Sequence, residues 1–391
     1  MDEAVPMRDT SQNEEERAEP QAEAAAQHPA PAQHLSEFTP VHVPSPKLDR
    51  VPWLAVIVFV AVSFGLAWLA ASPLWIMGPT SPSFPIALPV FGSVMMFTPT
   101  IAMLVVVFLF RTPPKGDRLR FLGIWPLRPA KRTVWLIVIG LFAPIAIAVL
   151  AIAIAVLFGW VKLDLVEFSG LRAMLAATLP ESAMASMPPF GLLIAVQLLM
   201  LPLGAVVNSG TAFGEEFGWR GWLVPVLRPL GTWPALVISG AIWGLWHSPL
   251  ILLGYNFGLT DWRGVALMTI ACVFWGVLLG WLRLRSGSVW PAVIAHGSLN
   301  ACASLVLLFA AAEPAPQAAL ATPLGAAGWI AIAIVVAVLV AFGQFSPKRQ
   351  PDLATPRSMQ LARQAAAGVK AATQVGDGAP TPGVDEGAGR P

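Results

Sequence analysis

Charged residues are scarce in this chain. Only 12% of its 391 residues are Asp, Glu, Lys or Arg, whereas a soluble domain carries about a quarter. Hydrophobic residues make up 56% of the sequence, and the mean hydropathy is +0.68. No water-soluble core of this size needs so much apolar sequence, so the composition excludes an ordinary soluble domain. It indicates instead that a lipid bilayer surrounds much of the chain.

Cysteine and net charge are also nearly absent. The two cysteines, Cys272 and Cys302, both lie inside apolar runs, which excludes a disulfide framework and favours small buried core residues. The net charge of +2 is too small to indicate a nucleic-acid partner. No cleavable signal peptide opens the chain, and the first apolar run is long enough to span a membrane, so we expect it to be a signal anchor.

Long apolar runs are what the sequence has in quantity. A helix needs about 20 residues to cross the hydrocarbon core of a bilayer. Eight runs approach or exceed this length, at roughly 51–72, 86–110, 133–160, 190–212, 233–254, 262–282, 288–311 and 323–345. The sequence therefore predicts an all-α polytopic membrane protein with about eight transmembrane helices. The fourth helix is expected to continue through the polar residues that follow its run.

Polar tails flank this region. Residues 1–49 and 346–391 are rich in Ala, Pro, Gly and Gln and hold few large apolar residues, so we expect both tails to be disordered. The stretch 50–345 between them is the predicted transmembrane domain. Within it, segment 161–189 mixes charges with Leu and Met and predicts a short helix at the membrane surface.

The placement of Lys and Arg predicts the orientation. The segment between the second and third runs carries many basic residues against one acid, Asp117, and is therefore expected to be cytoplasmic. Its basic residues are Arg111, Lys115, Arg118, Arg120, Arg128, Lys131 and Arg132. With eight helices, both termini are then expected in the cytoplasm. A composition rich in Ala, Pro and Arg but poor in Lys favours a bacterial protein, and so an inner-membrane location.

An acidic pair follows the fourth run. If this stretch is helical, Glu216 and Arg220 are four residues apart, share a face and can pair, which lowers the cost of burying both. Glu215 lies about 100° around the helix and has no partner at that spacing. The pattern indicates Glu216–Arg220 as a brace and Glu215 as a general base for water. The alternative is a charged cluster that caps the helix at the cytoplasmic interface.

Two histidines lie inside later apolar runs, where ionisable groups usually mark function. Trp243 precedes His247 by four residues, so its indole can pack on the imidazole. His296 and Asn300 are also four apart, and both side chains can donate hydrogen bonds to a developing oxyanion. Hydrogen bonds that merely join helices are the alternative for each. Glutamate, two histidines and an asparagine together form a plausible set for activating water against a carbonyl.

Glu215-Glu216-x-x-x-Arg220, Trp243-x-x-x-His247 and His296-x-x-x-Asn300 occur in this order. The set resembles the three-motif signature of the CAAX prenyl protease 2 (Rce1-like) and bacteriocin-processing membrane proteases, the CPBP or Abi family, over about residues 190–312. The resemblance implies an intramembrane endopeptidase in which Glu215 activates water with help from His247. It implies that His296 and Asn300 stabilise the oxyanion, with structural support from Glu216, Arg220 and Trp243.

The resemblance also bears on cofactor and substrate. The second motif usually begins with Phe, so Trp243 is a departure that changes the shape of the pocket more than the chemistry. The family is often labelled metalloprotease, but His-Glu-x-x-His is missing here. Zinc is therefore an alternative cofactor, whose ligands would be Glu215, His247 and His296. The implied substrate is a membrane-associated protein or peptide, prenylated in the branch that gives the family its name.

Two other functions fit the same residues. Some family members are associated with bacteriocin self-protection, so an immunity or partner-binding protein needs no catalysis. A transporter could use intramembrane Glu and His residues as a proton relay. Polar clusters on three helices without an inverted repeat argue against transport.

Overall fold

The computed structural model describes residues 48, 50–113, 115, 118–127, 129–346 and 349–350. Within these residues the only β-structure is one bridge between Leu163 and Ala310, so the all-α prediction is confirmed. The predicted disordered tails lie almost wholly outside the described residues, as do Asp117 and Arg128 of the basic segment.

The helices follow the predicted runs. In chain order they are α1 (Trp53–Met77), α2 (Phe84–Met95), α3 (Thr98–Leu109), α4 (Arg118–Phe121), α5 (Ala130–Leu157), α6 (Ser169–Ala176), α7 (Glu181–Ala185), α8 (Phe190–Glu216), the π-helix η2 (Phe217–Leu223), α9 (Val224–Leu227), the 3₁₀ turn η3 (Arg228–Leu230), α10 (Thr232–Trp246), α11 (Ser248–Ile251), α12 (Trp262–Ser286), α13 (Trp290–Cys302), η4 (Leu305–Leu308), α14 (Ala318–Ala321) and α15 (Ala326–Ala341). The short helices α6 and α7 occupy the segment predicted to hold a short helix.

Seven helical stretches of the described chain are long and apolar enough to cross a membrane, one fewer than the sequence predicts. The difference lies in the fifth run, where α10 has 15 residues and ends at Trp246. Pro249 has no N–H for the carbonyl of Leu245, and this oxygen accepts a hydrogen bond from the Ser248 hydroxyl. The helix therefore stops beside His247, and the chain continues as the short helix α11.

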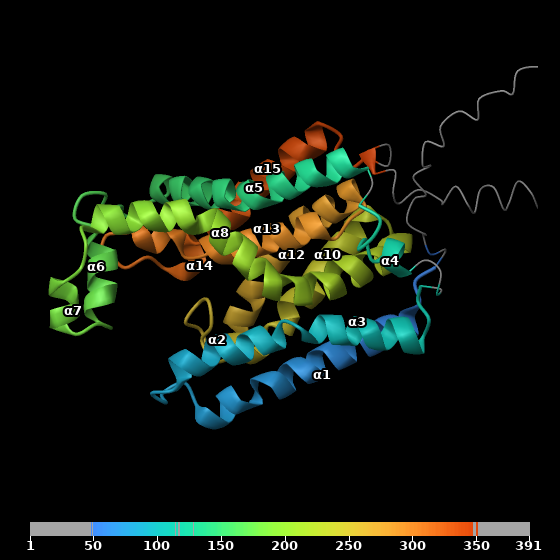
Figure 1. Cartoon of the computed structure of the whole chain (residues 1–391), viewed down its shortest axis with the longest axis horizontal. Coiled ribbons are helices and arrows are strands. Elements are labelled where there is room, and N and C mark those ends of the chain that lie inside the picture. Colours follow the sequence, from blue (N-terminus) through green and yellow to red (C-terminus); the bar gives the residue numbers. More distant parts are fainter. Residues whose placement is uncertain are drawn as a thin grey trace, which may run out of the picture. The chain divides into compact units, whose positions relative to one another are not determined.

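The helices pack in a defined order (Figure 1). α13 lies against both α8 and α5, α12 pairs with α10, and α15 packs on α5. α1 packs against α2 and α3 on the other side of the protein. The motif residues Glu215, Glu216, Arg220 and His296 of α8, η2 and α13 are buried between these helices.

Glycines allow two of these helix pairs to approach closely. A Cβ atom on Gly297 of α13 would lie 2.7 Å from the backbone nitrogen of Ser209 in α8. A Cβ atom on Gly244 of α10 would lie 3.0 Å from the backbone nitrogen of Thr269 in α12. Real Cβ atoms rarely make such contacts, so only glycine permits this spacing. Both glycines lie beside a motif histidine and bring its helix close to a neighbour.

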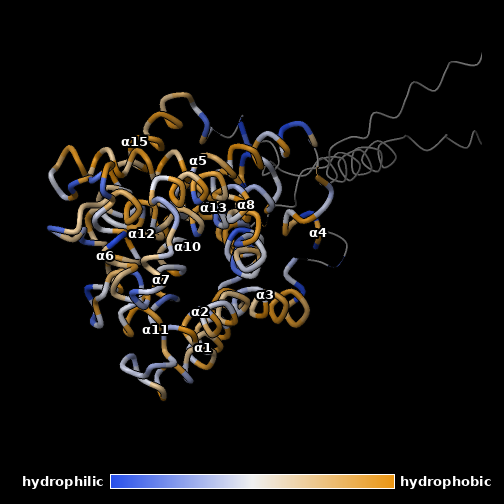
Figure 2. Tube along the Cα trace, turned by 60° about the vertical axis from the view of Figure 1, so that its left-hand side comes forward, coloured by the Kyte–Doolittle hydropathy of each residue, from blue (hydrophilic) through white to orange (hydrophobic). Residues whose placement is uncertain are grey.

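The outer surface is apolar along the long helices. Large hydrophobic side chains are exposed on most of them, including Ile57, Leu157, Leu199, Val207 and Val338. Figure 2 shows hydrophobic residues running along α3, α5 and α15. Such a surface suits lipid tails, because apolar patches of this extent are unusual on soluble monomers.

Candidate active site

The acidic pair lies at the C-terminal end of α8. Glu215 and Glu216 are 2% and 0% exposed, and the predicted continuation of the fourth helix through them is confirmed. After Glu216 the chain widens into the π-helix η2, which carries Arg220. π-helical segments are rare and occur often at functional sites.

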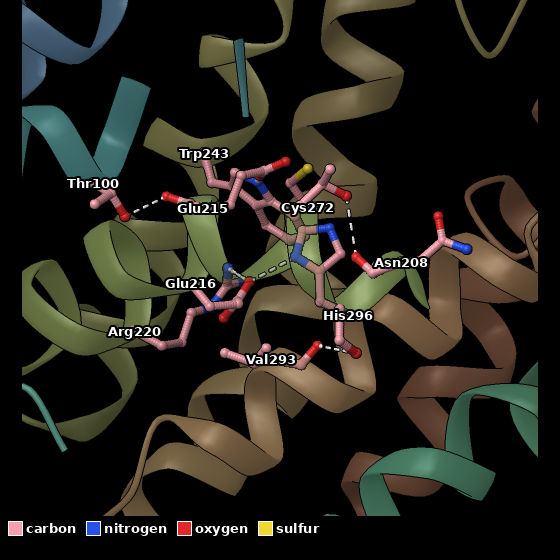
Figure 3. A network of polar contacts seen from close by, with 12 residues as sticks. Thr100, Asn208, Glu215, Glu216, Arg220, Trp243, Cys272, Val293 and His296 are labelled. Carbon is pink, nitrogen blue, oxygen red and sulfur yellow. Dashed lines mark hydrogen bonds and ion pairs between the residues drawn. The ribbon is translucent and has the colours of Figure 1, made fainter. Parts of the chain in front are cut away.

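Glu216 binds two partners, Arg220 and His296, through one oxygen. Its Oε1 accepts a hydrogen bond from Arg220 Nη1 at 2.8 Å and lies 2.8 Å from His296 Nδ1. Figure 3 shows the carboxylate of Glu216 between the two side chains. The predicted Glu216–Arg220 brace is therefore confirmed. The contact with His296 was not predicted, because it joins α8 to a helix 80 residues further along the chain.

Glu215 has a different environment. Its Oε2 accepts a hydrogen bond from the indole Nε1–H of Trp243 at 2.6 Å. No cation contacts it within the described residues, in agreement with the predicted lack of a partner at helical spacing. The two neighbouring carboxylates thus differ: Glu216 is paired with the guanidinium of Arg220, whereas Glu215 is held by a neutral donor.

His247 lies directly after the last residue of α10. Its Nδ1 is 2.9 Å from the carbonyl oxygen of Trp243. A carbonyl can only accept a hydrogen bond, so Nδ1 carries the proton, and in the neutral ring Nε2 has the free lone pair. The rings of Trp243 and His247 lie 5.7 Å apart, which confirms the predicted packing of indole and imidazole. His247 therefore has an acceptor nitrogen, and it lines the same cavity as Glu215.

The four predicted catalytic side chains share one cavity of about 340 Å³. Glu215, His247 and His296 are buried in its wall, and the more exposed Asn300 also lines it. Glu216 and Arg220 do not line it. The structure thus brings Glu215, His247, His296 and Asn300 to one cavity. The Glu216–Arg220 pair lies outside the cavity lining.

Other polar residues of this wall were missed in the sequence. Asn208 and Thr211 line the cavity on α8, and they precede Glu215 by seven and four residues. That spacing places all three side chains on one helix face, so the sequence held a usable signal. Tyr255 and Asn256 line it from the turn after α11. Nothing in their local sequence pointed to the cavity.

Arg283 of α12 binds backbone groups next to the site but does not line the cavity. It is fully buried, and its Nε donates to the carbonyl of Arg220 at 3.1 Å while its Nη2 donates to the carbonyl of Phe121 at 2.6 Å. From the sequence, Arg283 reads as a charge flanking a membrane helix. Its role in connecting η2 to α4 depends on three segments that are distant in the chain.

The donor set does not fit a metal ion in this arrangement. Among the residues that the structure describes, no three His, Cys, Asp or Glu side chains are grouped so that they could hold one ion.

Comparison with known proteins agrees with the motifs. Residues 194–302 match the family described as type II CAAX prenyl endopeptidase Rce1-like. They form an Rce1-like domain. The stretch contains all three motifs and falls inside the 190–312 region where the sequence resembles that family, so the resemblance is confirmed.

A curated relative is similar over part of the chain. CAAX prenyl protease 2 of Methanococcus maripaludis is 29% identical over 93 residues, which are 22% of this chain. The chain spans about a third of that relative's length, 34%. Together with the apolar helices, the Rce1-like domain indicates an integral membrane protein.

Proposed function

We propose that this protein is an intramembrane endopeptidase of the CAAX-protease type. The observation that carries the proposal is the shared cavity, in which Glu215, His247, His296 and Asn300 converge from three helices. Taken singly, each side chain is also explained by a structural role, such as a hydrogen bond that joins two helices. Together they supply a general base, an acceptor beside it and two donors, which is the set that hydrolysis of an amide requires.

The reaction begins with a water molecule bound near Glu215 and the Nε2 of His247. Glu215 removes a proton from this water, the oxygen forms a bond to the substrate carbonyl carbon, and the carbonyl electrons move to its oxygen. When the tetrahedral intermediate collapses, the C–N bond breaks, and Glu215 returns its proton to the leaving amine. His247 orients the water through the lone pair that its bond to Trp243 leaves free.

His296 and Asn300 stabilise the oxyanion. Asn300 donates from its amide. Because Nδ1 of His296 faces Glu216, its Nε2 can donate only when it also carries a proton. The Glu216 carboxylate accepts the Nδ1 hydrogen and holds the ring in place, so the proposed oxyanion role of His296 requires the imidazolium form. Glu216 therefore serves the oxyanion site as well as the brace with Arg220.

The substrate is a membrane-associated protein or peptide. The name of the relative, CAAX prenyl protease 2, indicates a prenylated substrate. A cavity between membrane helices also suits a lipidated or hydrophobic segment. We place the protein in a bacterial inner membrane with both termini cytoplasmic, as the distribution of Lys and Arg favours. Cleavage then occurs on the cytoplasmic side.

The test is peptide cleavage by the purified full chain in detergent or lipid. Glu215→Gln keeps the size of the side chain but removes the base, and we expect at least a 100-fold loss of kcat. Glu181→Gln on the exposed helix α7 is the matched control and should cleave like the wild type. A chelator arm tests zinc directly.

A folded Glu215→Gln protein that cleaves at the wild-type rate would exclude this mechanism. If an immunity function were found and it survived loss of both Glu215 and His247, partner binding without catalysis would replace the proposal.

A further inference from the structure

Trp243 contacts four of the five charged or titratable groups of the motif set, namely all except Glu216. Its Nε1–H donates to Glu215 Oε2 at 2.6 Å. The guanidinium carbon of Arg220 lies 4.2 Å from the centre of its ring, a cation–π contact. The rings of His296 and His247 lie 5.3 and 5.7 Å away. The indole is 3% exposed and lines the cavity.

The indole of Trp243 has one partner on its ring face and another at its edge. On its face, Arg220 is held against the ring and against Glu216. At its edge, the N–H takes one oxygen of Glu215. An arginine at that edge would weaken Glu215 as a base more than the indole does, because a charged donor stabilises a carboxylate more strongly than a neutral one.

We propose that the indole N–H of Trp243 is a positioning group for the general base. It occupies Oε2 of Glu215 and so directs Oε1, which has no hydrogen-bond partner among the described residues, toward the water in the cavity. This inference rests on the proposed function, because it assigns Trp243 a part in that same reaction. Trp243 then has two roles: packing of its ring stabilises the fold, and its N–H increases kcat.

The two tasks can be separated by substitution. Trp243→Phe keeps an aromatic ring for Arg220 and the histidines but has no donor. Replacement of Trp243 by benzothienylalanine, in which sulfur stands for the N–H, keeps even the two-ring shape. Trp222→Phe is the matched control: Trp222 is fully buried, donates one indole hydrogen bond to the carbonyl of Thr112 at 2.9 Å, and lies away from the cavity.

The experiment measures kcat and KM for these variants of the full chain, with Glu215→Gln in the same assay and thermal unfolding in detergent as a check on folding. A lost hydrogen bond to a charged group corresponds to about a 10- to 100-fold loss. We expect this loss in kcat for both Trp243 replacements, with KM changed by less than about threefold. The Trp222→Phe control should keep the wild-type kcat.

A wild-type kcat in the benzothienylalanine protein would overturn the inference, since only the donor has been removed. Equal losses of kcat in Trp243→Phe and Trp222→Phe would also overturn it, because the effect would then follow from core packing. If Trp243→Phe does not fold, the benzothienylalanine protein decides the question. Activity that persists in Glu215→Gln would instead remove the proposed function, so the two failures are distinguishable.

Discussion

The long apolar helices of this protein differ in how much of their surface is buried against other helices. In the most apolar stretches of Trp262–Ser286 and Trp290–Leu308, 61% of residues are buried within the protein. In Ala318–Ala341 the share is 28%. The hydropathy of the outer stretch is higher, 2.6 against 2.2 and 1.5. Among these three stretches, the most apolar one is the least buried. Phe190–Leu230 departs from this order, because its most apolar stretch has a hydropathy of 2.3 and is only 17% buried.

Buried charges are not confined to the most buried helices. Arg283 lies on Trp262–Ser286, whereas Glu216 and Arg220 lie at the buried end of Phe190–Leu230, and each has a partner. In a region without water, a charged group is tolerated only when its partners neutralise or solvate it. The faces that point into the protein can therefore carry chemistry, because neighbouring helices supply such partners.

The largest effect on stability is expected from breaking the buried ion pair. Glu216→Ala leaves Arg220 buried without its carboxylate and removes the partner of His296. Loss of one member of a buried pair lowers the free energy of unfolding by about 3–5 kcal/mol. Thermal or denaturant unfolding of the full chain in detergent measures it.

The double variant Glu216→Gln/Arg220→Met removes both charges and is the control. It should recover a large part of the lost stability, because no uncompensated charge remains. Equal destabilisation of the double variant and Glu216→Ala would show that shape, not charge, determines the stability of this region.

A smaller effect is expected at the crossing of α8 and α13. Gly297→Leu forces a side chain into the backbone of Ser209 and should lower the free energy of unfolding by about 1–3 kcal/mol, as overpacking does. Gly210→Leu on α8 is the matched control, since nothing lies within 4 Å of a Cβ built there and the residue is exposed. If Gly210→Leu destabilised the protein as much as Gly297→Leu, the inner and outer faces of α8 would not differ as described.

The smallest effect is expected outside the membrane helices, at Asp164. Hydrogen bonds from the side chain of Ser169 and from the N–H groups of Glu167, Ser169 and Val166 hold the pKa of this carboxyl well below its usual range. The folded pKa is depressed, so the stabilisation is present above the unfolded value of about 3.9 and is lost as the pH falls below it.

Asp164→Asn tests this pH dependence. We expect a Tm slightly below that of the wild type at pH 7, and a difference that shrinks as the pH falls below about 4. Differential scanning of both proteins across this range measures it. A Tm difference that stayed constant with pH would mean that the carboxylate charge does not contribute.

How much of the site was predictable depends on where each contact lies in the chain. The Glu216–Arg220 pair follows from a spacing of four residues on one helix, and so does the packing of Trp243 on His247. By contrast, the bonds from Trp243 to Glu215 and from Glu216 to His296 join residues 28 and 80 positions apart. No local periodicity specifies such pairs.

By itself, the sequence determined the helical class, the membrane setting and the residues able to do chemistry, because hydropathy and helical spacing are local properties. The tertiary structure decided that Trp243 binds Glu215 and that His296 contacts Glu216, that Tyr255 and Asn256 line the cavity, and that the fifth run forms a helix of 15 residues. These outcomes depend on which helices approach one another. Close approach is set by the packing of glycines and buried charges across helices that are far apart in the chain.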